Sequence, residues 1–448
     1  MTLMNNASRR VLRGGTVLAS ALTLALSLTA CGSSDDGSES SPADVDAALA
    51  EGGSLTVWTW DLTMKQVAKD FEAAHPKVKI NLVNAGTNKD QYTALENAIS
   101  AGKGVPDVAQ IEYYALGQFS LSKSLADLSA YGADELADSY SPGPWNAVAS
   151  GDQVYALPLD SGPMALYYNK KVFDKHGIAV PKTWDEYVDA ARKLHKADPK
   201  VFITNDAGEP GFATSLIWQA GGRPYKVDGT KVSVDFSDAG SRTYADTWQK
   251  LLDDKLVAPV VSWSDEWFKG LADGSIATLA TGAWMPTNLE TGAASAAGDW
   301  RVAPLPQWKA GAAVSAENGG SSLAIPAASK NKELAYAFLE YANAGAGVKS
   351  RVDDGAFPAT TAELTSKEFL AKKFDYFGGQ EANKIFSESA SQVPDGWSYL
   401  PFQVYANSIF NDNVGKAYAS NTTLSQGLAQ WQKASVAYGK EQGFTIGD

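Results

Sequence analysis

The chain has 448 residues, with 51 acidic and 38 basic side chains, and a formal net charge of −13 at neutral pH. This acidic balance disfavours nucleic acid as a partner, because binding to phosphates needs clustered Lys and Arg. The length exceeds what one hydrophobic core usually supports, so at least two lobes are expected.

The N-terminus has the pattern of an export signal. Arg9, Arg10 and Arg13 precede an unbroken run of small and apolar residues over 16–30, as in the charged and apolar regions of a signal peptide. At about 15 residues the run is shorter than the roughly 20 that a membrane-spanning helix needs. Residues 1–30 are therefore predicted to be removed, which leaves a net charge of −16. General secretory and twin-arginine export both remain open.

The apolar run ends in Leu28-Thr29-Ala30-Cys31, which resembles a bacterial lipobox. Cys31 is the only cysteine of the chain, so it cannot form an intrachain disulfide. Lipidation of its sulfur explains why an exported protein carries a single thiol. An ordinary signal peptide with an incidental cysteine is the alternative. Residues 31–51 are expected to form the lipidated cysteine and a disordered tether, since 32–41 are polar with nothing to bury. The protein is then anchored on the extracellular face of the cell membrane.

The first folded part alternates between strand and helix patterns. Apolar residues alternate over 55–59, recur at helical spacing over 64–71, and alternate again over 78–82. A second helical stripe over 92–99 leads to a third apolar strand over 107–111. Repeated β-α-β units predict an α/β fold with a parallel, doubly wound sheet.

Later segments continue the mixed pattern. A strand is predicted over 164–168, and Thr183-Trp184-Asp185-Glu186 has the form of a capping box that opens a helix. Another helix follows Ser329, and the stretch from 364 to the end is mostly helical in pattern.

In doubly wound sheets, ligands bind outside the carboxyl ends of the strands. Trp60 and Asp61 follow the first predicted strand, Asn88 follows the second, and Glu112 and Tyr113 follow the third. These polar and aromatic side chains are candidate ligand contacts.

Several short motifs occur together in this order and spacing. They are Gly104-Val105-Pro106-Asp107-Val108, Ala156-Leu157-Pro158-Leu159-Asp160, Leu166-Tyr167-Tyr168-Asn169-Lys170, Pro181-Lys182-Thr183-Trp184-Asp185-Glu186, Gly282-Ala283-Trp284 and Asn331-Lys332-Glu333-Leu334-Ala335. With them the chain resembles the family 1 extracellular solute-binding proteins of ABC importers, the group that includes maltodextrin-binding protein. The resemblance covers 52–448 and is greatest to oligosaccharide-binding lipoproteins of actinobacteria.

The resemblance implies a two-lobe periplasmic-binding-protein fold, in which each lobe is a doubly wound sheet flanked by helices. The ligand cleft lies between the lobes, which close by hinge bending. The N-terminal lobe is expected to contain 52–160 plus 317–350, and the C-terminal lobe 161–316 plus 351–448. The crossings are expected near Leu159 to Pro163, Ala316 to Ser322 and Asp354 to Pro358. The implied partners are ABC permease subunits in the membrane, and the protein itself is expected to be a monomer.

A short oligosaccharide is the expected ligand. Pyranose faces pack on aromatic rings, and hydroxyls bond to carboxylates and amides; the chain has 13 Trp and 18 Tyr. The family position of Trp284 faces the ligand, and Asp160 and Asn318 lie near predicted crossings. Further aromatic candidates lie in loops or at strand ends: Trp60, Trp218, Trp263 and Trp397. Three tryptophans in helical patterns are instead predicted to be core, namely Trp184, Trp248 and Trp431.

Other functions remain as alternatives. The same fold can bind a non-sugar solute, such as a polyamine or ferric iron, and a secreted glycoside hydrolase also combines aromatic platforms with paired carboxylates. The three histidines, at 75, 176 and 195, form no ligand cluster, so no metal site is expected. The sequence has no phosphate-binding glycine loop of the G-x-x-x-x-G-K-[ST] form, and no cofactor is expected. The assignment is therefore a binding protein and not an enzyme.

Overall fold

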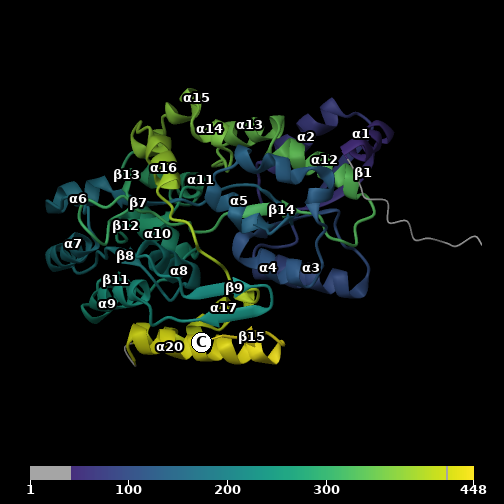
Figure 1. Ribbon diagram of the computed structural model, residues 1–448. Helices are drawn as coiled ribbons and strands as arrows, with labels where there is room; N and C mark the ends of the chain where they lie inside the picture. Colours follow the sequence, from purple (N-terminus) through teal and green to yellow (C-terminus); the bar gives the residue numbers. More distant parts are fainter. Residues whose placement is uncertain (1–41, 420–421, 448) are drawn as a thin grey trace, which may run out of the picture. The chain divides into compact units, whose positions relative to one another are not determined.

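The computed structural model describes residues 42–419 and 422–447 (Figure 1). Its first sheet has five strands in the order β2-β1-β3-β14-β6. These are β1 (Gly53–Trp58), β2 (Val78–Val83), β3 (Val108–Glu112), β14 (Ser321–Ala324) and β6 (Leu157–Pro158). The first three strands are parallel, as predicted, whereas β14 runs antiparallel to both of its neighbours. The predicted parallel sheet is therefore mixed. The reason is that β14 begins opposite Glu112, at the carboxyl end of β3, with no crossover that would return it to the other end.

Helices pack around this sheet with the predicted apolar stripes inward. In α2, the first of these helices, the helical spacing correctly predicted which residues are buried: Met64, Val67, Ala68 and Phe71. The helices are α2 (Met64–Ala74), α3 (Lys89–Ala101), α4 (Tyr113–Leu121), α5 (Pro142–Val148), α12 (Lys332–Asn343) and α13 (Ala346–Asp353). A small hairpin, β4 (Ala149–Ser150) and β5 (Gln153–Val154), follows α5.

The second region is built on the antiparallel strands β12-β7-β13. They are β7 (Met164–Asn169), β12 (Thr278–Gly282) and β13 (Trp300–Pro304), with a parallel pair beside them, β8 (Thr204–Asn205) and β11 (Val257–Ala258). A doubly wound parallel sheet was expected here as well, so this expectation is corrected. Periodicity identifies a strand but does not encode the direction in which the connection returns it to the sheet.

The remaining elements complete the second region. Its helices are α6 (Lys170–His176), α7 (Trp184–Ala197), α8 (Pro210–Gln219), α9 (Ala239–Asp253), α10 (Asp265–Asp273) and α11 (Met285–Gly292). The C-terminal stretch is mostly helical, as predicted: α14 (Thr361–Leu364), α15 (Lys367–Leu370), α16 (Ala382–Ser391), α17 (Gln403–Ser408), α18 (Phe410–Asn413), α19 (Gly415–Tyr418) and α20 (Leu424–Glu441). The hairpin β9 (Tyr225–Asp228) and β10 (Lys231–Val234) pairs with the last strand, β15 (Thr445–Ile446). Among the described helices, none is long and apolar enough to cross a membrane.

The buried apolar residues form separate cores. Those around the first sheet come from 45–159 and 323–342, and those around the second come from 164–316 and 357–431. Trp184, Trp248 and Trp431 are fully buried in the second set, as predicted. This partition supports the proposed lobe boundaries, 52–160 plus 317–350 and 161–316 plus 351–448.

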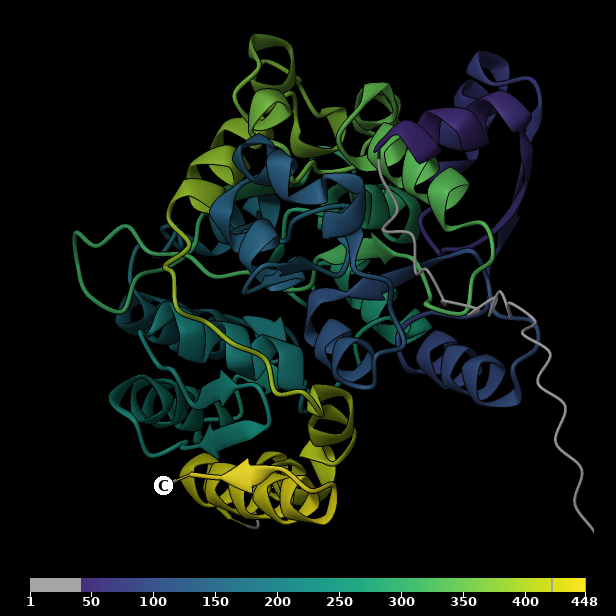
Figure 2. The same ribbon diagram turned by 45° about the vertical axis from the view of Figure 1, so that its right-hand side comes forward.

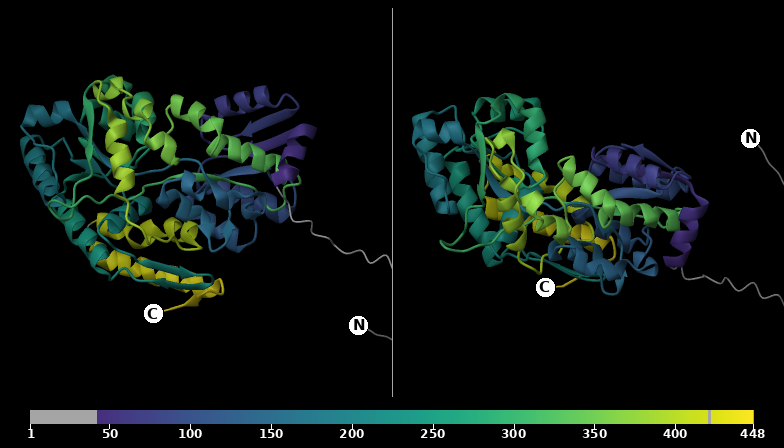
Figure 3. Two further views of the ribbon diagram at one scale, coloured as in Figure 1. Left: turned by 45° about the horizontal axis from the view of Figure 1, so that its top comes forward. Right: turned by 90° about the horizontal axis from the view of Figure 1, so that it is seen from above.

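Helix α1 (Pro42–Glu51) corrects the end of the expected tether. Residues 42–51 were expected to be disordered, but they form a helix that lies against α12 (Figure 3). Its Val45 is buried in the first core, so the segment has an apolar contact that a polar tether lacks. Cys31 and the predicted signal peptide lie outside the described residues.

The three segments expected to cross between the lobes are hydrogen-bonded to one another. The Asn318 N–H donates to the Gly162 carbonyl at 2.8 Å, and Asp160 pairs with Pro358 in an antiparallel bridge. The segments therefore run side by side. Figure 2 shows a further extended segment, between α16 and α17, which contains Trp397.

Candidate functional site

Two of the predicted acids lie beside a buried arginine. Asp61 follows β1, and its Oδ2 accepts a hydrogen bond from Arg351 Nη2 at 3.1 Å. Arg351 is 1% exposed and also donates from Nη1 to the carbonyl of Leu159. Asp160, on the first crossing, accepts at Oδ1 from the Ser321 N–H at 2.6 Å. Arg351 lies on α13, just before the third crossing, and thus links that helix to the first crossing and to Asp61.

Burial governs the ionisation of Asp160. Loss of solvent raises its pKa to about 6, while the Arg351 charge and the bonds from Ser321 oppose this shift and the Asp61 charge adds to it. The positive charge of Arg351 therefore acts on both Asp160 and Asp61.

Glu112 ends β3 and is held by Tyr92 of α3. The Tyr92 hydroxyl donates to Glu112 Oε2 at 2.9 Å and accepts from the Glu112 N–H at 3.0 Å. Burial raises the pKa of Glu112 to about 7, against the lowering effect of hydrogen bonds from Tyr92 and Tyr114. The side chain is partly exposed, so the carboxyl group can bind either as donor or as acceptor near neutral pH.

Tyr113, by contrast, lies beneath the other predicted residues. It is buried, its hydroxyl donates to the Asp160 carbonyl at 2.6 Å, and its ring lies where a side chain at Gly320 would be. Tyr113 therefore fixes the first and second crossings.

Trp284 and Trp263 form an aromatic pair. Their rings lie 5.8 Å apart with an interplanar angle of 27°, and Trp263 is 52% exposed. Trp263 takes φ of +71° in the loop before α10, a left-handed conformation that is uncommon for a bulky residue. The Trp284 Nε1–H donates to the Asn318 carbonyl at 2.7 Å. The half-buried Trp284 ring is thus held beside the second crossing, and the exposed Trp263 ring stacks on it.

The side chain of Asn318 is bonded at both ends. Its Oδ1 accepts from Thr281 Oγ1 at 3.2 Å, and its Nδ2 donates to Ser215 Oγ at 3.2 Å. Asn318 therefore connects β12, α8 and the crossings, and its carbonyl receives the Trp284 indole.

A second aromatic pair joins α8 to the segment before α17. Trp218 and Trp397 stack at 5.0 Å with an interplanar angle of 7°. Trp218 is 6% exposed and donates from Nε1 to the Pro394 carbonyl at 2.9 Å. Trp397 is only half-buried and has Tyr399 at its edge. Trp218 thus supports Trp397, which keeps the more open ring.

The remaining predicted residues differ in setting. Trp60 is half-buried and meets Tyr92 edge-to-face at 6.4 Å, which places it close to Glu112. Asn88 is exposed just before α3, with φ of +49°, away from the contacts described above. The structure therefore places the candidate acids Asp61, Glu112 and Asp160 in one acidic group. Four tryptophans form two aromatic pairs, and Asn88 lies apart from both.

Sequence reasoning missed Arg351 and Glu317. Glu317 is 5% exposed, and burial raises its pKa to about 7 despite hydrogen bonds from Gly162 and Ser161. A charged residue inside or near a predicted crossing was the available signal. A charged residue at such a position is equally typical of the protein surface, so the sequence alone does not single these two residues out.

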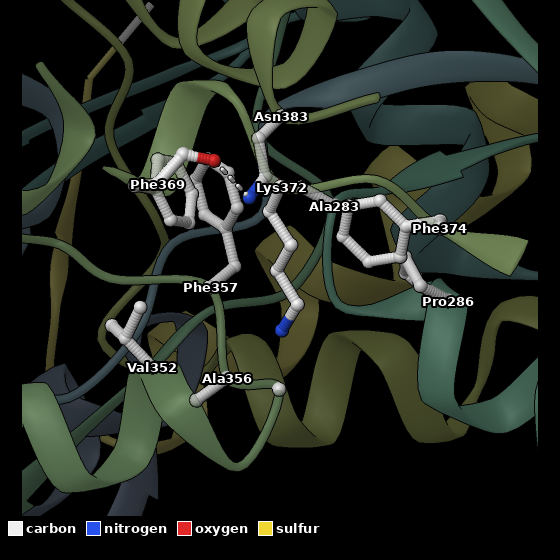
Figure 4. Close-up of a pocket in the computed structure, with 10 residues that line it drawn as sticks. Ala283, Pro286, Val352, Ala356, Phe357, Phe369, Lys372, Phe374 and Asn383 are labelled. Carbon is white, nitrogen blue, oxygen red and sulfur yellow. Dashed lines mark hydrogen bonds between the residues drawn. The ribbon is translucent and has the colours of Figure 1, made fainter. Parts of the chain in front are cut away.

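An apolar pocket lies on the other side of the Ala283–Trp284 turn. Phe357, Phe369, Phe374 and Val352 line it, and Asn383 donates to the Phe369 carbonyl at its edge (Figure 4). It shares no residue with the predicted set. Within the described residues, no three His, Cys, Asp or Glu side chains are grouped so that they could hold a metal ion.

Comparison with known proteins assigns the family. A family model described as a bacterial extracellular solute-binding protein matches residues 59–348. The chain belongs to this family. The family consists of solute-binding proteins, so the carboxylates described above are ligand-binding candidates and not a catalytic pair. The glycoside hydrolase alternative is therefore rejected.

Individual relatives match nearly the whole folded part of this solute-binding protein. An ABC-transporter-associated binding protein of B. animalis subsp. lactis Bl-04, in complex with β-1,6-galactobiose, is 46% identical with a TM-score of 0.82, over 88% of this chain and 99% of its own. The galacto-N-biose/lacto-N-biose I-binding protein of Bifidobacterium longum is 27% identical with a TM-score of 0.78, over 89% and 99%. The lactose-binding protein of Rhizobium radiobacter is 25% identical over 365 residues, which are 76% of this chain and 83% of the relative. The predicted periplasmic-binding-protein fold is confirmed.

Removing the buried guanidinium is expected to destabilise the solute-binding protein strongly. Arg351→Met leaves Asp61 and Asp160 without their cation, and breaking such a buried pair costs roughly 3–5 kcal/mol. Urea unfolding measures the loss. Lys349→Met, which removes an exposed ion pair to Asp353 on the same helix, is the control and should change the stability little, because solvent screens an exposed pair. Equal losses in the two variants would contradict the role given to Arg351.

The buried carboxyls predict that the free energy of unfolding falls as pH rises from 5 to 8. The pKa of Glu112 is about 7 in the folded protein and ordinary when unfolded, so the folded state holds more protons over this range. Asp160 and Glu317 act in the same direction. Urea unfolding at a series of pH values should show a shallower slope for Glu112→Gln than for the unmodified protein. An unchanged slope would remove Glu112 from this group.

Proposed function

We propose that this protein captures a short, neutral oligosaccharide outside the cell and delivers it to an ABC importer. The observation that carries the proposal is the indole pair of exposed Trp263 and half-buried Trp284, in which Trp284 is fixed to the second crossing by Asn318. An aromatic platform of this kind suits the C–H face of a pyranose. Partly exposed carboxyl groups, such as Glu112, suit its hydroxyls.

The relatives narrow the class of sugar. The most similar of the three compared above was solved with β-1,6-galactobiose, another with lacto-N-biose, and the third is named for lactose. Each of these sugars is a disaccharide that contains galactose. We therefore propose a galactose-containing disaccharide, or a slightly longer oligosaccharide, as the ligand.

Capture depends on contacts from both sides of the crossings. Asp61 and Glu112 lie at the carboxyl ends of β1 and β3 in the first region. Trp284 packs on the core of the second region, and Trp263 contacts Trp267 of that core. A sugar that touches both groups binds better when they approach each other. Ligand binding then favours the closed arrangement by its differential affinity for it. Permease subunits that contact both lobes are the proposed membrane partners of the monomer.

Binding can be tested by titration calorimetry with β-1,6-galactobiose, lactose and lacto-N-biose, with spermidine as a non-sugar ligand. We expect heat with at least one of the sugars and none with spermidine. Trp284→Ala should weaken sugar binding at least about tenfold, equivalent to about 1.4 kcal/mol, because the indole face is lost.

The control for that titration is Tyr341→Ala, which truncates a half-buried ring that packs on Phe71 of α2. It should keep the affinity of the unmodified protein. Binding of spermidine alone would overturn the sugar proposal and leave the family assignment in place. Full affinity in Trp284→Ala would remove the indole platform from the site.

The proposed anchor is a lipid on Cys31, ahead of helix α1. Such an anchor keeps the protein on the extracellular face of the membrane, since one covalent lipid adds about 0.8 kcal/mol of membrane affinity for each buried CH₂ group. Expression in a bacterial host followed by membrane fractionation should find the unmodified chain with the membrane and Cys31→Ser in the soluble fraction. Equal distribution of both would contradict lipid anchoring.

A further inference from the structure

Glu317 lies on the second crossing and binds the first crossing with both carboxylate oxygens. Ser161 Oγ lies 3.1 Å from Oε1 and 3.2 Å from Oε2, and the Gly162 N–H donates to Oε2 at 2.5 Å. The residue is 5% exposed. A buried carboxylate is stable only when such donors replace water, so its bonds hold the two segments in one register.

The backbone of Glu317 makes two more connections. Its carbonyl accepts from Ser215 Oγ of α8 at 2.8 Å, and the residue pairs with Pro163 in an antiparallel bridge. Glu317 is therefore fixed from the first crossing and from the second core region together.

The next residue transmits this position to the indole platform. The Asn318 N–H donates to the Gly162 carbonyl, and the Asn318 carbonyl accepts from Trp284 Nε1. The backbone contacts at these glycines are close. A Cβ at Gly162 would lie 2.2 Å from the Asn318 carbonyl oxygen, and one at Gly282 would lie 2.3 Å from Trp284 Nε1. A displacement of the Gly162–Asn318 pair must therefore move the indole as well.

We infer that Glu317 is a positioning residue, which sets the place of the Trp284 ring through Gly162 and the Asn318 carbonyl. It does so without touching the ligand, because its oxygens are already occupied by the first crossing. The inference rests on the proposed function, in which Trp284 packs on the sugar. Its structural half, that Glu317 places Trp284, is testable without any ligand.

The test compares Glu317→Ala with Asp107→Ala. Asp107 is a matched control because its carboxylate also accepts from a backbone N–H, that of Thr56 at 2.9 Å, and from a serine hydroxyl, that of Ser329 at 2.8 Å. It lies at the start of β3, at the opposite end of the strand from Glu112. Both variants lose bonds of the same kind, but only Glu317 is connected to Trp284.

The first readout is fluorine NMR of ligand-free protein labelled with 5-fluorotryptophan. Trp284→Phe identifies the Trp284 resonance by its disappearance. We expect Glu317→Ala to shift or broaden that resonance, Glu317→Gln to do so less because its amide oxygen still accepts from Gly162, and Asp107→Ala to leave it in place. An unmoved resonance in Glu317→Ala would overturn the inference.

The second readout is the affinity for β-1,6-galactobiose in a double-mutant cycle. Glu317→Ala should lower affinity about tenfold on its own and should have little further effect in Trp284→Ala, because residues that act through one another are not additive. Additive losses would overturn the inference. Full affinity in Trp284→Ala would instead remove the proposed indole platform, while the fluorine spectra would still decide whether Glu317 places that ring.

Discussion

The hydrogen bonds among the three adjacent crossings are the constraint on which the candidate site depends. The two core regions also meet where α17 packs on α4, but the crossings carry the contacts nearest to Asp160, Asn318 and Trp284. Gly162, Glu317 and Asn318 connect the first crossing to the second, and the bridge between Asp160 and Pro358 connects the first to the third. Glycine at 162 is required by distance, since any Cβ there would occupy the space of the Asn318 carbonyl. Small movements at this contact become movements of whole groups of ligand-binding side chains.

This arrangement puts ionisable groups where water is scarce. Asp160, Glu112 and Glu317 all have raised pKa values because burial penalises their charged forms. Arg351 offsets part of the cost for Asp160, and hydroxyl and backbone donors offset part of it for the other two. Buried polar networks of this kind are costly when one member is missing. The same feature makes them specific, because an incorrect register would leave a carboxylate without donors.

Much of the fold follows from local patterns, and the exceptions have physical causes. The apolar stripe of α2 and the core positions of Trp184, Trp248 and Trp431 depend on periodicity, which the sequence displays directly. The antiparallel direction of β14 depends on where the chain re-enters the sheet, which periodicity does not contain. Helix α1 was missed because it gains its order from α12, almost 300 residues away in the sequence.

In the candidate site, too, some residues could be predicted from local sequence patterns and others could not. Residues directly after strands, such as Asp61 and Glu112, were found because the carboxyl ends of neighbouring parallel strands meet at one edge. Trp284 came from the family resemblance. Arg351 and Glu317 could not be found in this way, since their significance lies in partners 192 and 155 residues distant, at Leu159 and Gly162. Tyr113 and Trp218 were predicted as ligand contacts because their residue types suit a sugar, yet they are buried beneath Asp160 and Trp397.

The ligand-facing groups and their supports therefore have different chemistry. The groups proposed to face the sugar, such as Trp263, keep exposed surface, and this surface costs stability until a ligand covers it. The supports, such as Glu317, are fully engaged and gain nothing from a ligand directly. A change of sugar specificity can then arise at the exposed rings with the crossings unaltered. A change at the crossings, in contrast, alters the placement of every ring at once and so affects all ligands together.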